Sequence, residues 1–98
     1  MKKYQITIKP TAENDLARRY AQIEKESPQN ALNWYLGIME AIEKLDELAE
    51  RCPIAPEDID IQRGIRHLIV GDYRVLYANE GDVVHVLHVR HGRHDRKL

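Results

Sequence analysis

The side chains that can perform acid–base chemistry or bind anions are concentrated between residues 64 and 95 of this chain. All five histidines lie there, and arginines are interspersed with them. The cationic and imidazole residues are Arg66, His67, Arg74, His85, His88, Arg90, His91, Arg93 and His94. They interrupt runs of Val, Ile, Leu and Tyr, which β-strands prefer. A sheet this basic and rich in histidine exceeds what a hydrophobic core requires, so the stretch predicts a functional surface.

The charge of the chain is divided unevenly along its length. Residues 1–62 hold 8 Lys or Arg against 12 Asp or Glu, whereas residues 63–98 hold 7 against 4. A basic pole on a chain of net charge −1 predicts a local anionic partner, such as a phosphate group or an acidic protein segment. It does not predict general coating of nucleic acid, which usually requires a strongly basic domain.

The histidine spacing does not predict a metal site. His85, His88, His91 and His94 recur every three residues, and on a strand this spacing places successive side chains on opposite faces. Cys52 is the only cysteine, so an internal disulfide is impossible and a cysteine-based zinc site is not expected. The sequence has neither a Gly-x-Ser-x-Gly motif nor a glycine-rich phosphate loop. We therefore expect no metal and no cofactor.

Turn residues divide the basic stretch into three predicted strands. The strands are expected at residues 65–70, 73–78 and 83–89, with turns at residues 71–72 and 79–82. These turns contain glycine, asparagine and aspartate, which tolerate positive φ or bond their own backbone. Simple alternation places the side chains of the last strand on two faces. The expected faces are Val83, His85, Leu87 and Val89 on one side, and Val84, Val86, His88 and Arg90 on the other.

Arg74 lies among apolar residues in the middle of the second of these strands. One interpretation is a surface arginine whose aliphatic stem covers the sheet. The other is an anion-binding arginine on a concave face, where its planar guanidinium fits a phosphate or a carboxylate.

The beginning of the chain predicts a strand followed by a helix. Residues 4–9 alternate and are rich in β-prone residues, and Pro10 ends this strand. Thr11 is expected to cap a helix over residues 12–26, because a threonine side chain can satisfy a free helix N–H group. The apolar residues of this helix recur at steps of four, four and three residues, which places them on one face. This face consists of Ala12, Leu16, Tyr20 and Ile23.

A second helix is predicted to begin at Ser27-Pro28, with serine as the cap and proline in the first helical position. A wide apolar stripe then extends over about six turns, and Cys52-Pro53 closes the helix. The stripe consists of Ala31, Trp34, Tyr35, Ile38, Met39, Ile42, Leu45, Leu48 and Ala49. The opposite face is charged and should be solvated. The short break between the helices predicts an antiparallel hairpin, and residues 54–62 form an acidic loop.

These elements predict one α+β domain over residues 1–98, with the order β-α-α-β-β-β. A helical hairpin with one apolar stripe must pack on one face of a mostly antiparallel four-stranded sheet. The other sheet face, and the end that carries the arginines, are expected to be open. No apolar run is long enough to cross a membrane, and no apolar leader segment follows the charged N-terminus. A cytoplasmic protein without a membrane partner is expected.

The pattern resembles the RelE/ParE superfamily of bacterial type II toxin–antitoxin toxins, often labelled plasmid-stabilisation proteins. The resemblance covers nearly the whole chain. It rests most specifically on Tyr73-Arg74-Val75 with Tyr77, and on the closing His91-Gly92-Arg93. Further matching positions are Ala12, Asp15, Leu16, Ser27, Pro28, Ala31, Pro53, Gly64, Ile65, Arg66, Val86, Leu87, His88, Val89 and Arg90. The resemblance implies a growth-arresting toxin that a cognate antitoxin neutralises by folding on it.

Two activities occur in this superfamily. RelE-like members cut messenger RNA on translating ribosomes, which requires an acid, a base and cations for the phosphate. For that activity the resemblance implies Arg74 and Arg93 as phosphate-binding residues and His91 or His94 as acid or base. Tyr77 is expected to be a core residue. ParE-like members instead poison DNA gyrase by binding it.

The departures from the nuclease pattern favour the ParE-like activity. No lysine pair precedes Arg74, no aromatic residue follows Tyr77, and the chain is nearly neutral where ribosome-dependent nucleases are usually strongly basic. A binding surface for the target is expected at Arg66, Arg74, Arg90 and Arg93. A non-toxic binding module, or a degenerate toxin kept for its antitoxin, is a third alternative.

Overall fold

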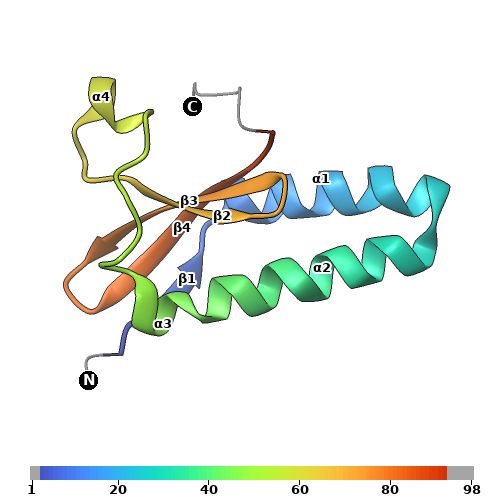
Figure 1. Ribbon diagram of the computed structural model, residues 1–98, viewed down its shortest axis with the longest axis horizontal. Helices are drawn as coiled ribbons and strands as arrows, with labels where there is room; N and C mark the ends of the chain where they lie inside the picture. The colour runs from blue at the N-terminus through green and yellow to red at the C-terminus, as the bar shows by residue number, and fades with distance from the viewer. Residues whose placement is uncertain (1–2, 93–98) are drawn as a thin grey trace.

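The computed structural model describes residues 3–92 (Figure 1). In chain order the elements are β1 Gln5–Ile8, α1 Pro10–Glu26, α2 Pro28–Glu43, α3 Leu45–Leu48, α4 Asp58–Ile61, β2 Arg66–Val70, β3 Tyr73–Glu80 and β4 Val83–His91. The predicted order β-α-α-β-β-β is confirmed, with two additional short helices. No helix within the described residues has both the length and the apolar composition that a membrane crossing needs.

The sheet has four strands in the order β1-β4-β3-β2. β1 is parallel to β4, whereas β4, β3 and β2 are antiparallel neighbours, which confirms the mostly antiparallel sheet. Two-residue turns join the last three strands, and Gly71 and Gly81 take the positive φ that these turns require. The prediction of a four-residue turn at 79–82 was wrong, because β3 continues to Glu80 and pairs there with Val83.

The helical hairpin covers one face of the sheet and encloses the main core. α1 and α2 lie side by side and run in opposite directions, and their connection at Ser27 projects beyond the sheet (Figure 1). Buried side chains from the helices meet buried side chains from β3 and β4. The principal members of this core are Leu16, Ile38, Ile42, Leu45, Val75, Tyr77, Val84, Val86 and Val89.

A register shift in the β3–β4 pair changes which side chains of β4 enter this core. Leu76 pairs with His88 but Tyr77 pairs with Val86, so Leu87 is an extra residue in β4. An extra residue reverses the alternation beyond it. Val89 is therefore buried in the same core as Val86, and the prediction that these two residues lie on opposite faces was wrong.

The second sheet face is covered in part by residues 53–64, which we call the strap. An antiparallel bridge joins Ile54 to Arg66 at the edge of β2, and the N–H of Ala55 donates to the carbonyl of Ile65 at 2.8 Å. A small second core lies beneath the strap, formed by Ala55, Ile65, Leu76 and Leu87. The prediction that this face is open was therefore wrong where the strap lies.

The helix starts differ in one case from the sequence prediction. Ser27 is confirmed as a cap, because its side chain accepts a hydrogen bond from the N–H of Asn30 at 3.2 Å. Thr11 is not a cap. Helix α1 begins two residues earlier than predicted, at Pro10, and the Thr11 hydroxyl instead donates to the carbonyl of Leu87 in β4 at 2.6 Å.

The long second helix that the apolar stripe predicts is broken. α2 ends at Glu43, and α3 restarts at Leu45 after a turn at Lys44. The break brings the carbonyl of Asp46 to the N–H of Tyr4, which donates to it at 3.0 Å just before β1. The apolar stripe is continuous in the sequence, but the helix is interrupted where its backbone bonds to the residue that precedes β1.

Tyr77 ties the sheet to the end of the helical layer. Its side chain is fully buried, and its hydroxyl donates to the carbonyl of Ala49 at 2.8 Å. Burial raises the pKa of the Tyr77 phenol, so it remains a neutral donor. Cys52 is also buried. The prediction that Tyr77 is a core residue is confirmed.

Replacing Tyr77 by phenylalanine should destabilise the fold measurably. Tyr77→Phe keeps the buried ring but leaves the Ala49 carbonyl without its donor, which should lower the free energy of unfolding by about 1–3 kcal/mol. Urea denaturation measures this. Tyr35→Phe is the matched control, because the Tyr35 ring is partly exposed and its change should stay within about 0.5 kcal/mol. Equal stability of the two variants would show that the hydrogen bond from Tyr77 to the Ala49 carbonyl does not stabilise the fold.

Candidate functional site

The arginine in the middle of the sheet is buried in an ion pair. Arg74 in β3 is 2% exposed. Its Nη1 donates to Oε1 of Glu57 at 3.0 Å and its Nη2 to Oε2 at 2.6 Å, so both atoms of the carboxylate are bound. Nδ1 of His67 lies 3.2 Å from Nη1 of the same guanidinium. Glu57 comes from the strap, so this pair fastens the strap to the sheet.

The electrostatics of the strap keep its two adjacent carboxylates ionised. Burial by itself would raise the pKa of Glu57, but the hydrogen bonds and positive charge of Arg74 outweigh burial, and the net pKa is below its usual value. Asp58 accepts hydrogen bonds from the N–H groups of Ile65 and Arg63, which lower its pKa. The strap is thus tied both to β3 and to the start of β2.

This geometry changes the interpretation of Arg74. It is neither a surface arginine nor an anion-binding arginine on an open face, because an internal carboxylate occupies its planar fork. Contact between Arg74 and a target would require Glu57 to leave first. Glu57 was not singled out from the sequence, where it is one of several acidic residues in a loop.

The other predicted site residues separate into two places. Arg90 pairs across the strands with Arg74, and the adjacent His91 is exposed with its ring 4.8 Å from that of Tyr73. Arg66 lies further along the sheet, where its Nη1 donates to the carbonyl of Cys52 at 2.5 Å. Two further candidates, Arg93 and His94, lie outside the described residues. The structure therefore brings Arg74, Arg90 and His91 to one end of the sheet.

The described histidines of the three-residue series have separate partners. His85 Nε2 lies 3.7 Å from Glu80, and His88 Nδ1 lies 3.3 Å from Asp15. Within residues 3–92, no group of three or more His, Cys, Asp or Glu side chains is placed to hold a metal ion.

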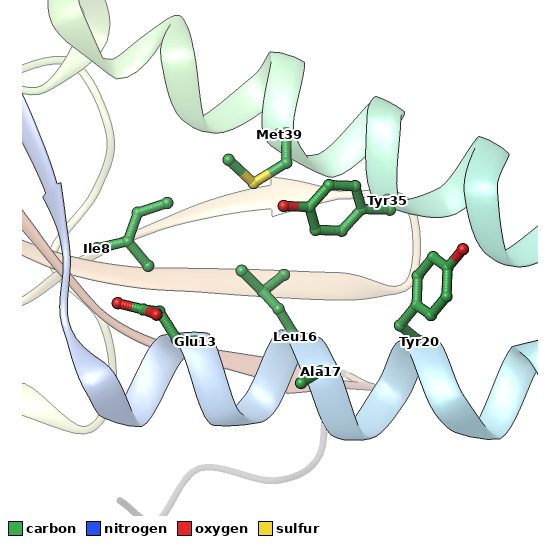
Figure 2. A pocket seen from close by; sticks show the side chains of 7 residues that line it. All are labelled: Ile8, Glu13, Leu16, Ala17, Tyr20, Tyr35 and Met39. Carbon is green, nitrogen blue, oxygen red and sulfur yellow. The ribbon is translucent and has the colours of Figure 1, made fainter.

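A hollow of the described chain lies between α1 and α2, and we call it the α1–α2 groove. Its volume is about 590 Å³. Figure 2 shows mostly apolar side chains converging on it from both helices and β1. The lining residues are Ile8, Glu13, Leu16, Ala17, Tyr20, Tyr35 and Met39. Tyr20 and Tyr35 meet edge to face at its outer end, with ring centroids 6.0 Å apart.

The groove was not predicted as a site, although several of its residues were in the predicted apolar stripes. Leu16, Tyr20, Tyr35 and Met39 were expected to pack against the sheet. Leu16 is buried in the main core and Met39 packs against that core as expected, whereas α2 leaves Leu32, Tyr35 and Leu36 exposed at helical spacing. The width of a helical hairpin depends on tertiary packing, so the stripes alone did not indicate an open groove.

Removing the charge of Glu57 should destabilise the protein and change its pH dependence. Glu57→Gln leaves a buried guanidinium without its counter-charge, which should cost about 3–5 kcal/mol in the free energy of unfolding. In the parent protein the folded pKa of Glu57 is lowered, so unfolding takes up a proton in acid. The stabilisation that ionised Glu57 gives the folded protein is fully present above the ordinary glutamate pKa of about 4.3. It is lost as the pH falls through the lower pKa of Glu57 in the folded protein. The variant should lack this part of the acid destabilisation.

Denaturation over a series of pH values measures both the loss of stability in Glu57→Gln and the change in its pH dependence. Glu47→Gln is the control, because Glu47 forms an exposed pair with Lys3 at 3.9 Å and should contribute less than about 1 kcal/mol. A Glu57→Gln variant as stable as this control at neutral pH would show that the ion pair does not hold the strap.

Comparison with known proteins places this architecture in a family. The model of the family described as the ParE toxin of type II toxin–antitoxin systems, parDE, matches residues 6–96. The fold is similar to that of a chain in the solved chromosomal ParDE toxin–antitoxin system from P. aeruginosa. The TM-score is 0.78 at 18% identity, with 95% of this chain and 100% of that chain covered. None of the curated protein sequences matches this chain. Because the family match extends over nearly its whole length, this protein belongs to the ParE toxin family of type II toxin–antitoxin systems.

Proposed function

We propose that this toxin arrests growth by inhibiting DNA gyrase, and that its cognate antitoxin neutralises it by occupying the α1–α2 groove. Membership of the ParE family supports the choice of target. Gyrase is a cytoplasmic enzyme, so the proposal also places the toxin in the cytoplasm.

The buried Arg74–Glu57 pair is the structural observation that carries the choice between the two activities of the superfamily. A ribosome-dependent nuclease needs cations that are open to the scissile phosphate. Arg74 is the arginine that the resemblance assigns to this role, and its guanidinium is bound by Glu57 inside the protein. A target that is recognised by binding alone does not require this arginine at the surface.

The α1–α2 groove has the chemistry of a site for an amphipathic segment. Its walls are apolar and aromatic, and Glu13 is the charged residue among its lining side chains (Figure 2). Exposed apolar side chains of this kind usually mark a partner site. The antitoxin segment that fits has apolar side chains at helical spacing, with a lysine or arginine near Glu13. The family supplies the occupant, because a ParE toxin is paired with an antitoxin.

Filling the groove should separate toxicity from neutralisation. Ala17 lines the groove and is exposed on α1, one helical turn after Glu13. Ala17→Arg places a long side chain in the groove, and its charge lies in the favourable i,i+4 position relative to Glu13, so the fold should be retained. We expect the variant to remain toxic but to bind the antitoxin at least about tenfold more weakly, a loss of about 1.4 kcal/mol. Co-purification and calorimetry with the product of the neighbouring antitoxin gene measure this.

The matched control is Asn33→Arg, which adds the same charge at an exposed position of α2 outside the groove. It should be neutralised normally. Full neutralisation of Ala17→Arg at unchanged affinity would show that the antitoxin binds elsewhere, whatever the target of the toxin.

The target is tested on the purified toxin. We expect inhibition of gyrase supercoiling in a reconstituted reaction, together with intact messenger RNA in cells after induction, because the proposed activity is binding rather than cleavage. The antitoxin should relieve the inhibition when added in equimolar amount. Transcripts cut only when they are translated, with normal supercoiling, would overturn the gyrase proposal in favour of the nuclease alternative.

A further inference from the structure

A second hollow lies on the other side of α1, where this helix separates from the end of β4. We call it the α1–β4 cleft. Its volume is about 250 Å³. In contrast to the α1–α2 groove, its lining is mostly polar and cationic. The lining residues are Asp15, Arg18, Arg19, Gln22, Val89, Arg90 and His91.

The cleft exists because β4 is longer than its neighbour β1. β1 ends at Ile8, opposite Val86, so the rest of β4 has no strand on that side. α1 covers this edge in its place. The Thr11 hydroxyl donates to the carbonyl of Leu87 at 2.6 Å, and the N–H of Val89 donates to Oδ2 of Asp15 at 3.0 Å. At the next turn of the helix the facing residues are arginines, and the cleft opens there.

Arg19 is held in a fixed position in the cleft. Its Nε donates to the hydroxyl of Tyr73 at 2.6 Å, and its Nη1 donates to Oε1 of Gln22 at 2.9 Å. Its guanidinium carbon lies 5.6 Å from the centroid of the Tyr73 ring. Within the described chain these two hydrogen bonds leave Nη2 as the unused end of the guanidinium. Arg19 is therefore oriented in advance, which lowers the entropy lost when it binds an anion.

The charges around the cleft are predominantly positive. Arg18 contributes a side chain that is 70% exposed and only loosely paired with Asp15, at 3.9 Å. Oδ2 of Asp15 is already engaged by the N–H of Val89 and lies 3.3 Å from His88. Arg90 lies across the cleft from these helix residues. Among the described residues that α1 contributes to the cleft, two guanidinium groups accompany one carboxylate, and this positive balance favours an anion.

We propose that the α1–β4 cleft binds a phosphate group of a nucleotide or a nucleic acid. Guanidinium groups donate in a fork that matches phosphate oxygens. His91 lines the cleft, is exposed and has its ring against that of Tyr73, so a base or a ribose joined to the bound phosphate could contact it. An aromatic surface of this kind suits a nucleotide better than an acidic peptide, because bases stack on aromatic rings. Neither gyrase inhibition nor antitoxin binding requires this site, so the inference goes beyond the proposed function.

The site is tested by direct binding to the purified chain. Sodium phosphate is titrated into the ¹⁵N-labelled protein at constant ionic strength, with sodium chloride as the reference, and the amide shifts are followed by NMR. The same titration with ATP and with a short DNA duplex distinguishes a free nucleotide from a nucleic-acid backbone. For the duplex, the slope of log affinity against log salt should fall by about 0.9 for each phosphate contact that a variant loses.

Arg18→Gln is the informative variant. Arg18 is exposed and its ion pair with Asp15 is weak, so its replacement should leave the melting temperature unchanged. We expect phosphate-induced shifts confined to the lining residues of the cleft, and affinity reduced about tenfold by the loss of one charge-assisted hydrogen bond. Arg51→Gln removes the same charge from an exposed position outside the cleft and should change the affinity by less than about twofold. Phosphate affinity of Arg19→Gln provides a second test, and the NMR spectrum of this variant shows whether it is folded.

Several results would overturn the inference. Shifts spread over the whole surface, or an equal loss in Arg18→Gln and Arg51→Gln, would mean that phosphate responds to net charge alone. Tighter binding of a glutamate-rich peptide than of ATP or DNA to the same amides would mean that the cleft recognises carboxylates. Because none of these measurements involves gyrase or the antitoxin, their failure is distinct from failure of the proposed function.

Discussion

The buried ion pair between Arg74 and Glu57 is the interaction on which the second face of the sheet depends. A guanidinium enclosed within a small domain must have its charge compensated, because an uncompensated buried charge costs several kcal/mol. The strap supplies the carboxylate that compensates it. In doing so it brings Ala55 over Ile65 and Leu76, and completes a second small core. One electrostatic requirement therefore determines where an otherwise acidic surface segment lies.

The unequal lengths of β1 and β4 are the second constraint. Because β1 stops at Ile8, helix α1 must satisfy the edge of β4, and it does so with Thr11 and Asp15, one turn apart. Helix α1 therefore borders a hollow on each of two faces. One side faces α2 across the apolar groove, and the other faces the end of β4 across the cationic cleft.

The two sides of α1 differ in chemistry, although their residues alternate in the sequence. Leu16, Ala17 and Tyr20 line the groove, whereas Arg18 and Arg19 line the cleft. About 100° of rotation per residue places such neighbours on different faces of a helix. An antitoxin segment in the groove therefore does not fill the cleft directly. Neutralisation that also blocked the phosphate site would require the antitoxin to continue around the helix.

The sequence by itself determined the elements of this protein, their order and the family resemblance, because its signals are local. Ser27-Pro28 starts a helix, glycines make the turns, and apolar periodicity separates helix from strand. Only the tertiary structure decided that Arg74 is buried and that Glu57, rather than another acidic residue of the same loop, is its partner. It also decided the extra residue at Leu87, which reverses the faces of β4. These features depend on contacts between segments far apart in the chain, and neither composition nor spacing specifies which distant residues will meet.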